Sequence, residues 1–157
     1  MSVNRLIYLP LGGAGEIGMN CYVYGYGPAG KERLILVDLG VTFPDMDGTP
    51  GVDLILPDIS WLEARLDRLD GIFITHAHED HIGALGHLWP RLQKRVYARR
   101  FTATIGRLKF EEAGLPVDTV EEWSSQRVSN PGPRAEAENL ARAEIPMFLA
   151  IRARKPG

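Results

Sequence analysis

The chain has 157 residues, 45% of them hydrophobic and 24% charged, a balance that fits one globular domain with a single core. Its net charge of −2 gives no overall attraction to nucleic acid, so a polyanion would have to bind to a local basic patch. The single cysteine, Cys21, excludes a disulfide framework and favours a reducing compartment, and the apolar segments are too short to cross a membrane, so we expect a cytoplasmic protein with no membrane partner.

The first part of the chain alternates β-forming runs with turns. Residues 5–9, 20–24 and 34–37 are rich in β-formers and predict three strands. Residues 13–18 match the G-x-G-x-x-G pattern of dinucleotide-binding proteins, and Asp38 lies about 20 residues beyond it. That fingerprint requires a helix directly after the glycines, whereas a β-forming run follows here. The pattern therefore favours a β-meander, and we expect no dinucleotide cofactor.

A helix, a strand and a second helix are predicted next. Four apolar residues recur at helical spacing and predict a helix that Asp58 or Ser60 can cap: Ile59, Leu62, Leu66 and Leu69. Residues 71–74 are a short apolar run typical of a buried strand. Residues 82–89 have the spacing of a helix, which we expect Pro90 to stop.

The following stretch combines a short strand, a helix and a group of cations. Residues 96–98 predict a strand, and a helix is expected over residues 102–113, ending at Gly114. Five basic residues crowd around the strand: Arg91, Lys94, Arg95, Arg99 and Arg100. A solvated rim is the favoured interpretation of these charges, and a phosphate-contacting patch is the alternative.

Three of the four histidines lie within residues 75–81, between a predicted strand and a predicted helix. Such a turn is where α/β folds usually present their chemistry, and imidazole and carboxylate are ligands suited to zinc and similar ions. Because His76 and His78 are one residue apart in an extended segment, both can face one side and hold one metal. Asp80 and His81 follow as the chain turns, and they point toward a second metal position a few ångströms away.

Two metal ions about 3.5–4 Å apart would clamp the attacking and leaving oxygens of a phosphodiester, with a hydroxide bound between them. Asp80 and His81 are therefore candidate catalytic residues as well as ligands. Glu79 and Asp38 suit positions behind the ligands, where a carboxylate fixes a histidine tautomer by accepting a ring N–H. The alternative, a charged solvent loop, is disfavoured because three such histidines rarely cluster at a strand end without a ligand.

These residues resemble a known family. Residues 76–81 match the H-x-H-x-D-H signature of the metallo-β-lactamase fold. Several separate stretches closely resemble the opening of ribonuclease J: residues 12–20, 37–40, 43–44, 51–58 and 75–83. The resemblance covers about residues 5–120.

The resemblance implies an α/β (α+β) fold, the αββα sandwich of metallo-β-lactamases, of which this chain would hold the N-terminal half. It implies two zinc ions per complete site and RNA as the substrate. The family cuts phosphodiester bonds as a 5′-to-3′ exonuclease and as an endonuclease, in RNA processing and decay. By the same resemblance, His76 and His78 would ligate one zinc ion, and Asp80 and His81 the other. Asp38 would be the buried aspartate that orients the site.

The chain also departs from the family pattern. The family's site needs a further histidine, a bridging aspartate and a last histidine from later strands, and no histidine follows His87 here. The family's additional RNA-gripping domains have no counterpart in this sequence. Zinc sites usually have three or four protein ligands, so we expect weak or absent metal binding and little or no catalysis by this chain alone.

Residues 1–120 are expected to form the family-like unit, and residues 121–157 a divergent tail. The tail is rich in arginine, alanine and proline, with a short helix near residues 135–143 and a strand at residues 147–151 as its only predicted elements. A shifted reading frame in GC-rich DNA, or poor order, would explain this composition. A half-sandwich would leave apolar sheet surface uncovered, so we expect self-association into a homo-oligomer.

Two other functions stay open at this point. One is a metallo-β-lactamase-fold hydrolase that acts on a thioester or lactone, although the sequence at residues 12–20 and 51–58 favours the ribonuclease. The other is a non-catalytic remnant or interaction module.

Overall fold

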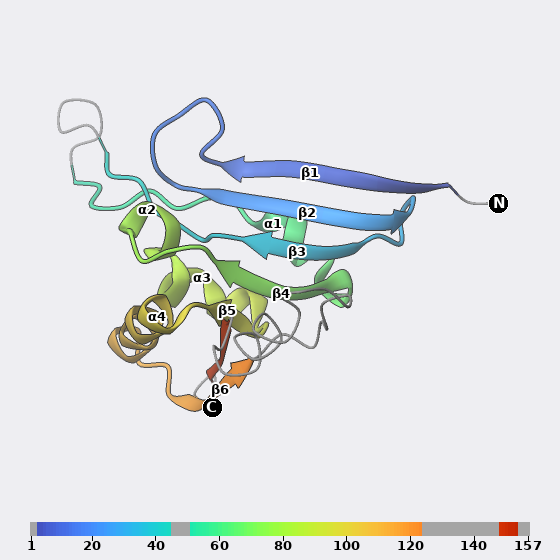
Figure 1. The fold of residues 1–157 in the computed structure, drawn as a ribbon. Helices are drawn as coiled ribbons and strands as arrows, with labels where there is room; N and C mark the ends of the chain where they lie inside the picture. Colours follow the sequence, from blue (N-terminus) through green and yellow to red (C-terminus); the bar gives the residue numbers. More distant parts are fainter. Residues whose placement is uncertain (1–2, 45–50, 124–147, 154–157) are drawn as a thin grey trace, which may run out of the picture.

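The computed structural model describes residues 3–44, 51–123 and 148–153. They form a mixed α/β fold built on one seven-stranded sheet with the strand order β1-β2-β3-β4-β5-β7-β6 (Figure 1). The strands are β1 (Asn4–Gly12), β2 (Cys21–Pro28), β3 (Arg33–Val37), β4 (Leu69–Ile74), β5 (Val96–Ala98), β6 (Val117–Trp123) and β7 (Phe148–Ala153). The helices are α1 (Ser60–Glu63), the short 3-10 helix η1 (Leu66–Arg68), α2 (Glu79–Ile82), α3 (Leu85–Leu92) and α4 (Arg100–Glu112).

The first three strands form the predicted antiparallel meander. β1 pairs with β2 from Asn4 opposite Pro28 to Gly12 opposite Cys21, and β2 pairs with β3 in the same sense. The glycine-rich segment between β1 and β2 is a strand-to-strand turn, and the first helix of the described residues begins only at Ser60. This segment therefore lacks the strand-turn-helix context that a dinucleotide fingerprint requires.

The middle strands β3, β4 and β5 run parallel to one another. Val37 pairs with Phe73, and Ile74 pairs with Ala98, so these strands end at the same edge of the sheet. The chain leaves that edge at Asp38 after β3, at Thr75 after β4 and at Arg99 after β5. Segments far apart in the sequence therefore start from neighbouring points, at the edge where open α/β sheets bind ligands.

Alternate residues of the central strands are buried under the helices. One buried cluster contains Leu36, Ile74 and Val96 from the sheet together with residues of α2, α3 and α4. Trp89 of α3 meets Phe110 of α4 edge to face, with ring centroids 5.4 Å apart. Because these side chains leave water together, the hydrophobic effect fixes α3 and α4 against the sheet.

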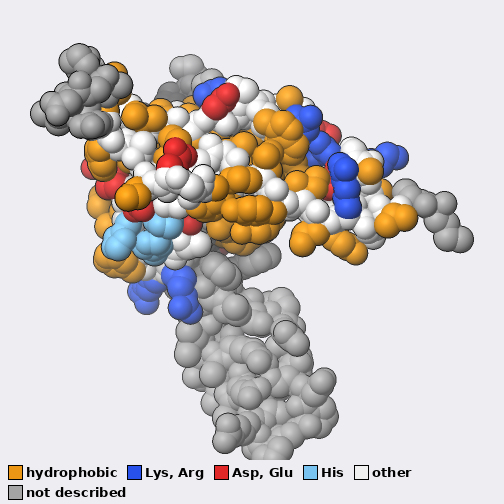
Figure 2. Space-filling view, turned by 90° about the horizontal axis from the view of Figure 1, so that it is seen from above, with side chains coloured by type: hydrophobic (Ala, Val, Ile, Leu, Met, Phe, Trp, Pro, Cys, Tyr) orange, Lys and Arg blue, Asp and Glu red, His pale blue; other side chains and the backbone are white. Residues whose placement is uncertain are grey.

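The opposite face of β1 and β2 carries apolar side chains that remain exposed. Leu6 is opposite Tyr26 and Tyr8 is opposite Tyr24 in the register, so all four lie on one face. Their exposed fractions are 75%, 62%, 54% and 38%, in the order Leu6, Tyr26, Tyr8 and Tyr24. Figure 2 shows hydrophobic side chains over much of the visible surface. Self-association through such a face stays a prediction.

Two predicted helices are wrong in length. The helix expected over residues 59–69 is broken into α1 and η1, because Leu69 belongs to β4 and pairs with Leu34 of β3. Pro90 does not stop the second helix. It lies inside α3, which continues to Leu92 and ends where Gln93 adopts a positive φ of 50°. Burial of Trp89 and Leu92 on either side of Pro90 outweighs the one backbone hydrogen bond that proline removes.

The last residues that the structure describes join the same sheet. The strand expected at residues 147–151 is confirmed as β7, which pairs antiparallel with both β5 and β6. The boundary expected after residue 120 falls within β6, and the division into a family-like unit and a tail stays a prediction. The helix expected at residues 135–143 lies outside the described residues. None of the helices in the described part of the chain has the length and apolar character to span a bilayer.

Candidate metal centre

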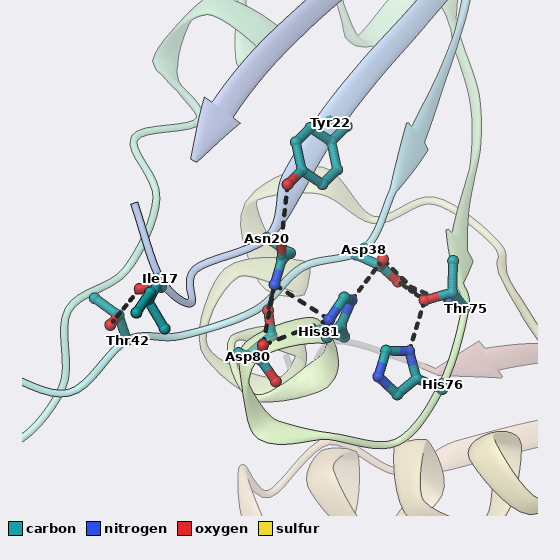
Figure 3. A network of polar contacts seen from close by, with 9 residues as sticks. All are labelled: Ile17, Asn20, Tyr22, Asp38, Thr42, Thr75, His76, Asp80 and His81. Carbon is teal, nitrogen blue, oxygen red and sulfur yellow. Dashed lines mark hydrogen bonds and ion pairs between the residues drawn. The ribbon is translucent and has the colours of Figure 1, made fainter. Parts of the chain in front are cut away.

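The three clustered histidines converge at the carboxyl edge of the parallel strands. His76 and His78 lie in the loop after β4, and His81 lies in α2, directly beyond it. The ring centroids of His76 and His78 are 4.7 Å apart, and those of His76 and His81 are 3.9 Å apart. Figure 3 shows the rings of His76 and His81 turned toward each other, with Asp80 beside His81. The fourth histidine, His87, is exposed on α3 outside this group.

Asp38 lies behind the cluster and is only 3% exposed. Its carboxylate accepts hydrogen bonds from His81 Nδ1 at 2.8 Å and from the Thr75 backbone N–H at 2.8 Å. The Thr75 hydroxyl also lies 2.9 Å from this carboxylate and 3.0 Å from His76 Nδ1. A carboxylate at Nδ1 favours the tautomer whose lone pair is on Nε2, and Nε2 lies 3.5 Å from Asp80 Oδ2.

Asn20 contacts the cluster from the end of the glycine-rich turn. Its amide nitrogen lies 3.1 Å from Asp80 Oδ2 and 3.2 Å from His81 Nε2, so it donates between the two groups (Figure 3). The Tyr22 hydroxyl donates to Asn20 Oδ1 at 2.8 Å and fixes the orientation of the amide. Burial and, next, the neighbouring Tyr8 raise the pKa of Tyr22, which keeps this hydroxyl protonated as a donor.

Backbone hydrogen bonds join the three loops that carry these side chains. The Asn20 N–H donates to the Asp80 carbonyl at 2.9 Å, and the Leu39 N–H donates to the His81 carbonyl at 2.8 Å. The Gly40 N–H donates to the Asn20 carbonyl at 2.9 Å. A Cβ on Gly40 would lie 1.7 Å from the Asp80 carbonyl oxygen, so only glycine allows the loops to approach this closely.

Glu79 faces a different partner from the one expected. Lys109 of α4 places its Nζ 2.7 Å from Glu79 Oε1, which ties α4 to the start of α2. Within the described residues, the Glu79 side chain forms no hydrogen bond or ion pair with a histidine, and its ion pair is with Lys109. In the geometry as it stands, Asp38 fixes a histidine tautomer and Glu79 is part of an ion pair.

Four residues of this network were given no individual role by the sequence interpretation: Asn20, Tyr22, Thr75 and Lys109. Asn20 and Thr75 are polar residues next to the glycine turn and the histidine motif, and Lys109 lies almost 30 residues downstream. The position of Asn20 at the end of a glycine-rich turn was the available signal. Lys109 gave none, because its contact depends on how α4 packs against α2.

Imidazole and carboxylate donors suit a divalent ion, but the described residues do not complete a zinc site. Among them, no group of three or more His, Cys, Asp or Glu side chains is spaced to hold a metal. The Asn20 amide lies between Asp80 and His81, the two residues assigned to one of the metals. Zinc would need these contacts to open and further ligands to be added.

A model of the Metallo-beta-lactamase superfamily matches residues 14–141. The chain belongs to the metallo-beta-lactamase superfamily. Within it, the chain is 47% identical to ribonuclease J of Sinorhizobium meliloti over 94% of its own length and 27% of that relative's length. It is 45% identical to ribonuclease J of Mycolicibacterium smegmatis over 74% of this chain and 21% of the relative. It is 43% identical to ribonuclease J of Helicobacter pylori over 68% of this chain and 15% of the relative.

These comparisons confirm the similarity to ribonuclease J. The chain spans about a quarter or less of the length of these relatives, and the similarity covers only their N-terminal part. A match over 94% of the chain extends beyond residue 121, into the segment for which the sequence predicts a divergent tail. The shifted reading frame stays a prediction.

Proposed function

We propose that this chain carries the first ligand segment of a ribonuclease J-type, metal-dependent RNA phosphodiester hydrolase, within the N-terminal half of an αββα sandwich. His76 and His78 would contact one zinc ion, and Asp80 and His81 the second. The proposed location is the cytoplasm. The relatives are ribonucleases by name, and RNA is the substrate class that their names imply.

One observation carries this proposal: three imidazoles converge at the carboxyl edge, and a buried aspartate holds one of them. The 2.8 Å contact from His81 Nδ1 to Asp38 favours the tautomer whose lone pair is on Nε2, as a metal ligand requires. Nε2 lies 3.5 Å from Asp80 Oδ2, the second residue proposed for the same metal, and the centroid of the His76 ring lies 3.9 Å from that of the His81 ring.

The chain alone is expected to bind zinc weakly and to hydrolyse RNA little or not at all, because its described residues supply too few ligands. Inductively coupled plasma mass spectrometry of the purified chain measures the zinc content directly. Two zinc ions held per chain through gel filtration would contradict this expectation.

A chimera tests the proposed function itself. Residues 1–120 of this chain replace the corresponding segment of the Sinorhizobium ribonuclease J, and hydrolysis of a labelled single-stranded RNA is measured with zinc present. We expect an active chimera that loses at least a hundredfold in kcat/KM in the His78→Ala and Asp80→Ala variants. The matched control, His87→Ala, alters an exposed histidine outside the cluster and is expected to retain activity.

The same chimera discriminates between the competing functions. A folded chimera that binds zinc but hydrolyses a thioester or lactone and not RNA would refute the RNA substrate. The contact of the Asn20 amide with both Asp80 and His81 is the observation that favours a non-catalytic remnant. An active chimera in which His76→Ala and His78→Ala change neither activity nor zinc content would support the remnant.

A further inference from the structure

The fold separates the basic residues that crowd residues 91–100 into different environments. Arg91 forms an ion pair with Glu63, at 2.6 Å. Arg95 directly precedes β5 and therefore lies at the amino edge of the parallel strands. Arg99 and Arg100 directly follow β5 and lie at the carboxyl edge, where the histidines are.

Arg99 and Arg100 differ from most of the other arginines in having no acidic partner. Five arginines form ion pairs within the described residues: Arg5, Arg33, Arg68, Arg91 and Arg107. Arg65 lies over the ring of Trp61 at 4.1 Å. Arg99 and Arg100 are exposed and form no ion pair with any described residue. Two adjacent uncompensated cations give a local positive potential in a chain whose net charge is −2.

The segment that carries Arg99 and Arg100 leaves the sheet next to the segment that carries the histidines. Ile74 at the end of β4 pairs with Ala98 at the end of β5, so the chain leaves the sheet at neighbouring points toward His76 and toward Arg99. In Figure 2, Lys and Arg side chains lie directly beside the histidine side chains at one end of the molecule. The segment with Arg99 and Arg100 and the segment with the histidines therefore start from the same edge of the sheet.

An exposed aromatic residue belongs to the same segment. Phe101 follows Arg100 in the first turn of α4 and is 73% exposed. An arginine fork binds phosphate oxygens in pairs, and an exposed ring stacks on a base whatever its sequence. A basic surface with exposed aromatic rings is the combination by which proteins bind single-stranded nucleic acid, and residues 99–101 carry both in one exposed segment.

We infer that Arg99, Arg100 and Phe101 form a contact surface for single-stranded RNA beside the candidate metal centre. The arginines contact backbone phosphates, and Phe101 stacks on a base. This inference rests on the proposed function, because it names the surface that would hold the RNA substrate. It concerns binding, so it can be tested without metal and without hydrolysis.

The test measures fluorescence anisotropy of a labelled single-stranded RNA with the full chain in EDTA, over a range of salt concentrations. For single strands, the logarithm of affinity falls with the logarithm of salt by about 0.7 per phosphate contact. The Arg99→Ala/Arg100→Ala double variant should therefore lower the slope by about 1.4, which is roughly 25-fold in affinity at 0.1 M salt. The Phe101→Ala variant should weaken binding at least about fivefold with an unchanged slope.

The matched control is the Lys31→Ala/Arg95→Ala double variant. It removes the same charge from two exposed residues that precede β3 and β5 at the opposite edge of the sheet, and it should keep the parent's slope and affinity. Circular dichroism establishes that each variant is folded. An Arg99→Lys/Arg100→Lys variant should keep the slope, because it keeps the charge.

Three results would overturn the inference: a parent chain that does not bind single-stranded RNA, equal losses in the two alanine double variants, or an unchanged slope after removal of Arg99 and Arg100. Its failure is distinguishable from failure of the proposed function. If the chimera is active and its RNA affinity is unchanged when Arg99 and Arg100 are replaced, the contact surface alone is refuted. An inactive chimera, with RNA binding by this chain that depends on the arginines, refutes the nuclease alone.

Discussion

Asp38 offers the sharpest test of how the candidate centre is built, because its backbone conformation and its carboxylate make separable contributions to the free energy of unfolding. The residue adopts a positive φ of 61°, and its buried carboxylate accepts from the Thr75 backbone N–H and from His81 Nδ1. Replacement by alanine removes both acceptors and also places a Cβ in left-handed backbone. Replacement by glycine removes the acceptors but tolerates the backbone conformation.

The magnitudes follow from these contacts. A buried donor left without an acceptor costs about 1–3 kcal/mol, and about 1–1.5 kcal/mol applies to each donor here, because Thr75 is exposed and the His81 side chain keeps 21% exposure. Two donors therefore cost about 2–3 kcal/mol, and alanine adds roughly 1–2 kcal/mol for the positive φ. We expect Asp38→Ala to lose about 3–5 kcal/mol and Asp38→Gly about 2–3 kcal/mol of the free energy of unfolding. Asp38→Asn keeps one oxygen and tolerates this φ, so about 1–2 kcal/mol is expected.

The assay is urea unfolding of the full chain and of the three variants, followed by tryptophan fluorescence, with Trp89 buried in the core as a reporter. The expected order of stability is parent, then Asn, then Gly, then Ala. Equal values for Ala and Gly would refute the backbone contribution. Values for all three variants within about 0.5 kcal/mol of the parent would refute the structural role of the carboxylate.

Three further predictions concern other parts of the molecule. Backbone N–H groups of Glu32 and Gly30, together with Arg5, lower the pKa of Glu32 from 4.5 to about 2, so the unfolded chain binds the proton first as the pH falls. Stability should therefore decline from about pH 4.5 to about pH 2. In thermal melts, Glu32→Gln should lower the melting temperature at pH 7 and flatten that decline. An unaltered pH profile would contradict this prediction. Burial and, secondarily, the charge of Asp38 raise the pKa of Cys21 to about 12. Ellman's reagent at pH 8 should therefore react with this thiol only after unfolding. Rapid reaction of the native chain would show that the thiol is accessible. Gly40→Ala should destabilise the chain by about 1–3 kcal/mol in urea unfolding, because the Cβ of the alanine would meet the Asp80 carbonyl. An unchanged midpoint would mean that the loops can separate freely.

The sequence predicted the parts of the fold that depend on local pattern. The three-strand meander, the strand before the histidines and the helix ending near Gly114, where φ is 70°, follow from residue periodicity and turn chemistry. The helix expected over residues 59–69 is broken because pairing of Leu69 with Leu34 competes with helical spacing. Periodicity alone cannot weigh a sheet contact against a helical turn.

The candidate centre was predictable in composition but not in its connections. Spacing placed His76, His78 and His81 at one strand end, and the structure brings their rings together. The contact of Asn20 with Asp80 and the pairing of Glu79 with Lys109 depend on how distant loops meet, which spacing does not encode. The position of Glu79 between His78 and His81 predicts a histidine partner, whereas the packing of α4 places Lys109 against its carboxylate.

The hydrogen bonds that join the loops of the candidate centre also bear on how the chain folds. Asn20 and Asp80 are 60 residues apart in sequence, and His81 and Asp38 are 43 apart. Closing such large loops has an entropic cost that must be met before the contacts return any stability, so high contact order slows folding. The network around His81 joins the loops that follow β3 and β4 to the start of β2, so we expect it to form only after these strands have paired and to serve as a marker of successful refolding.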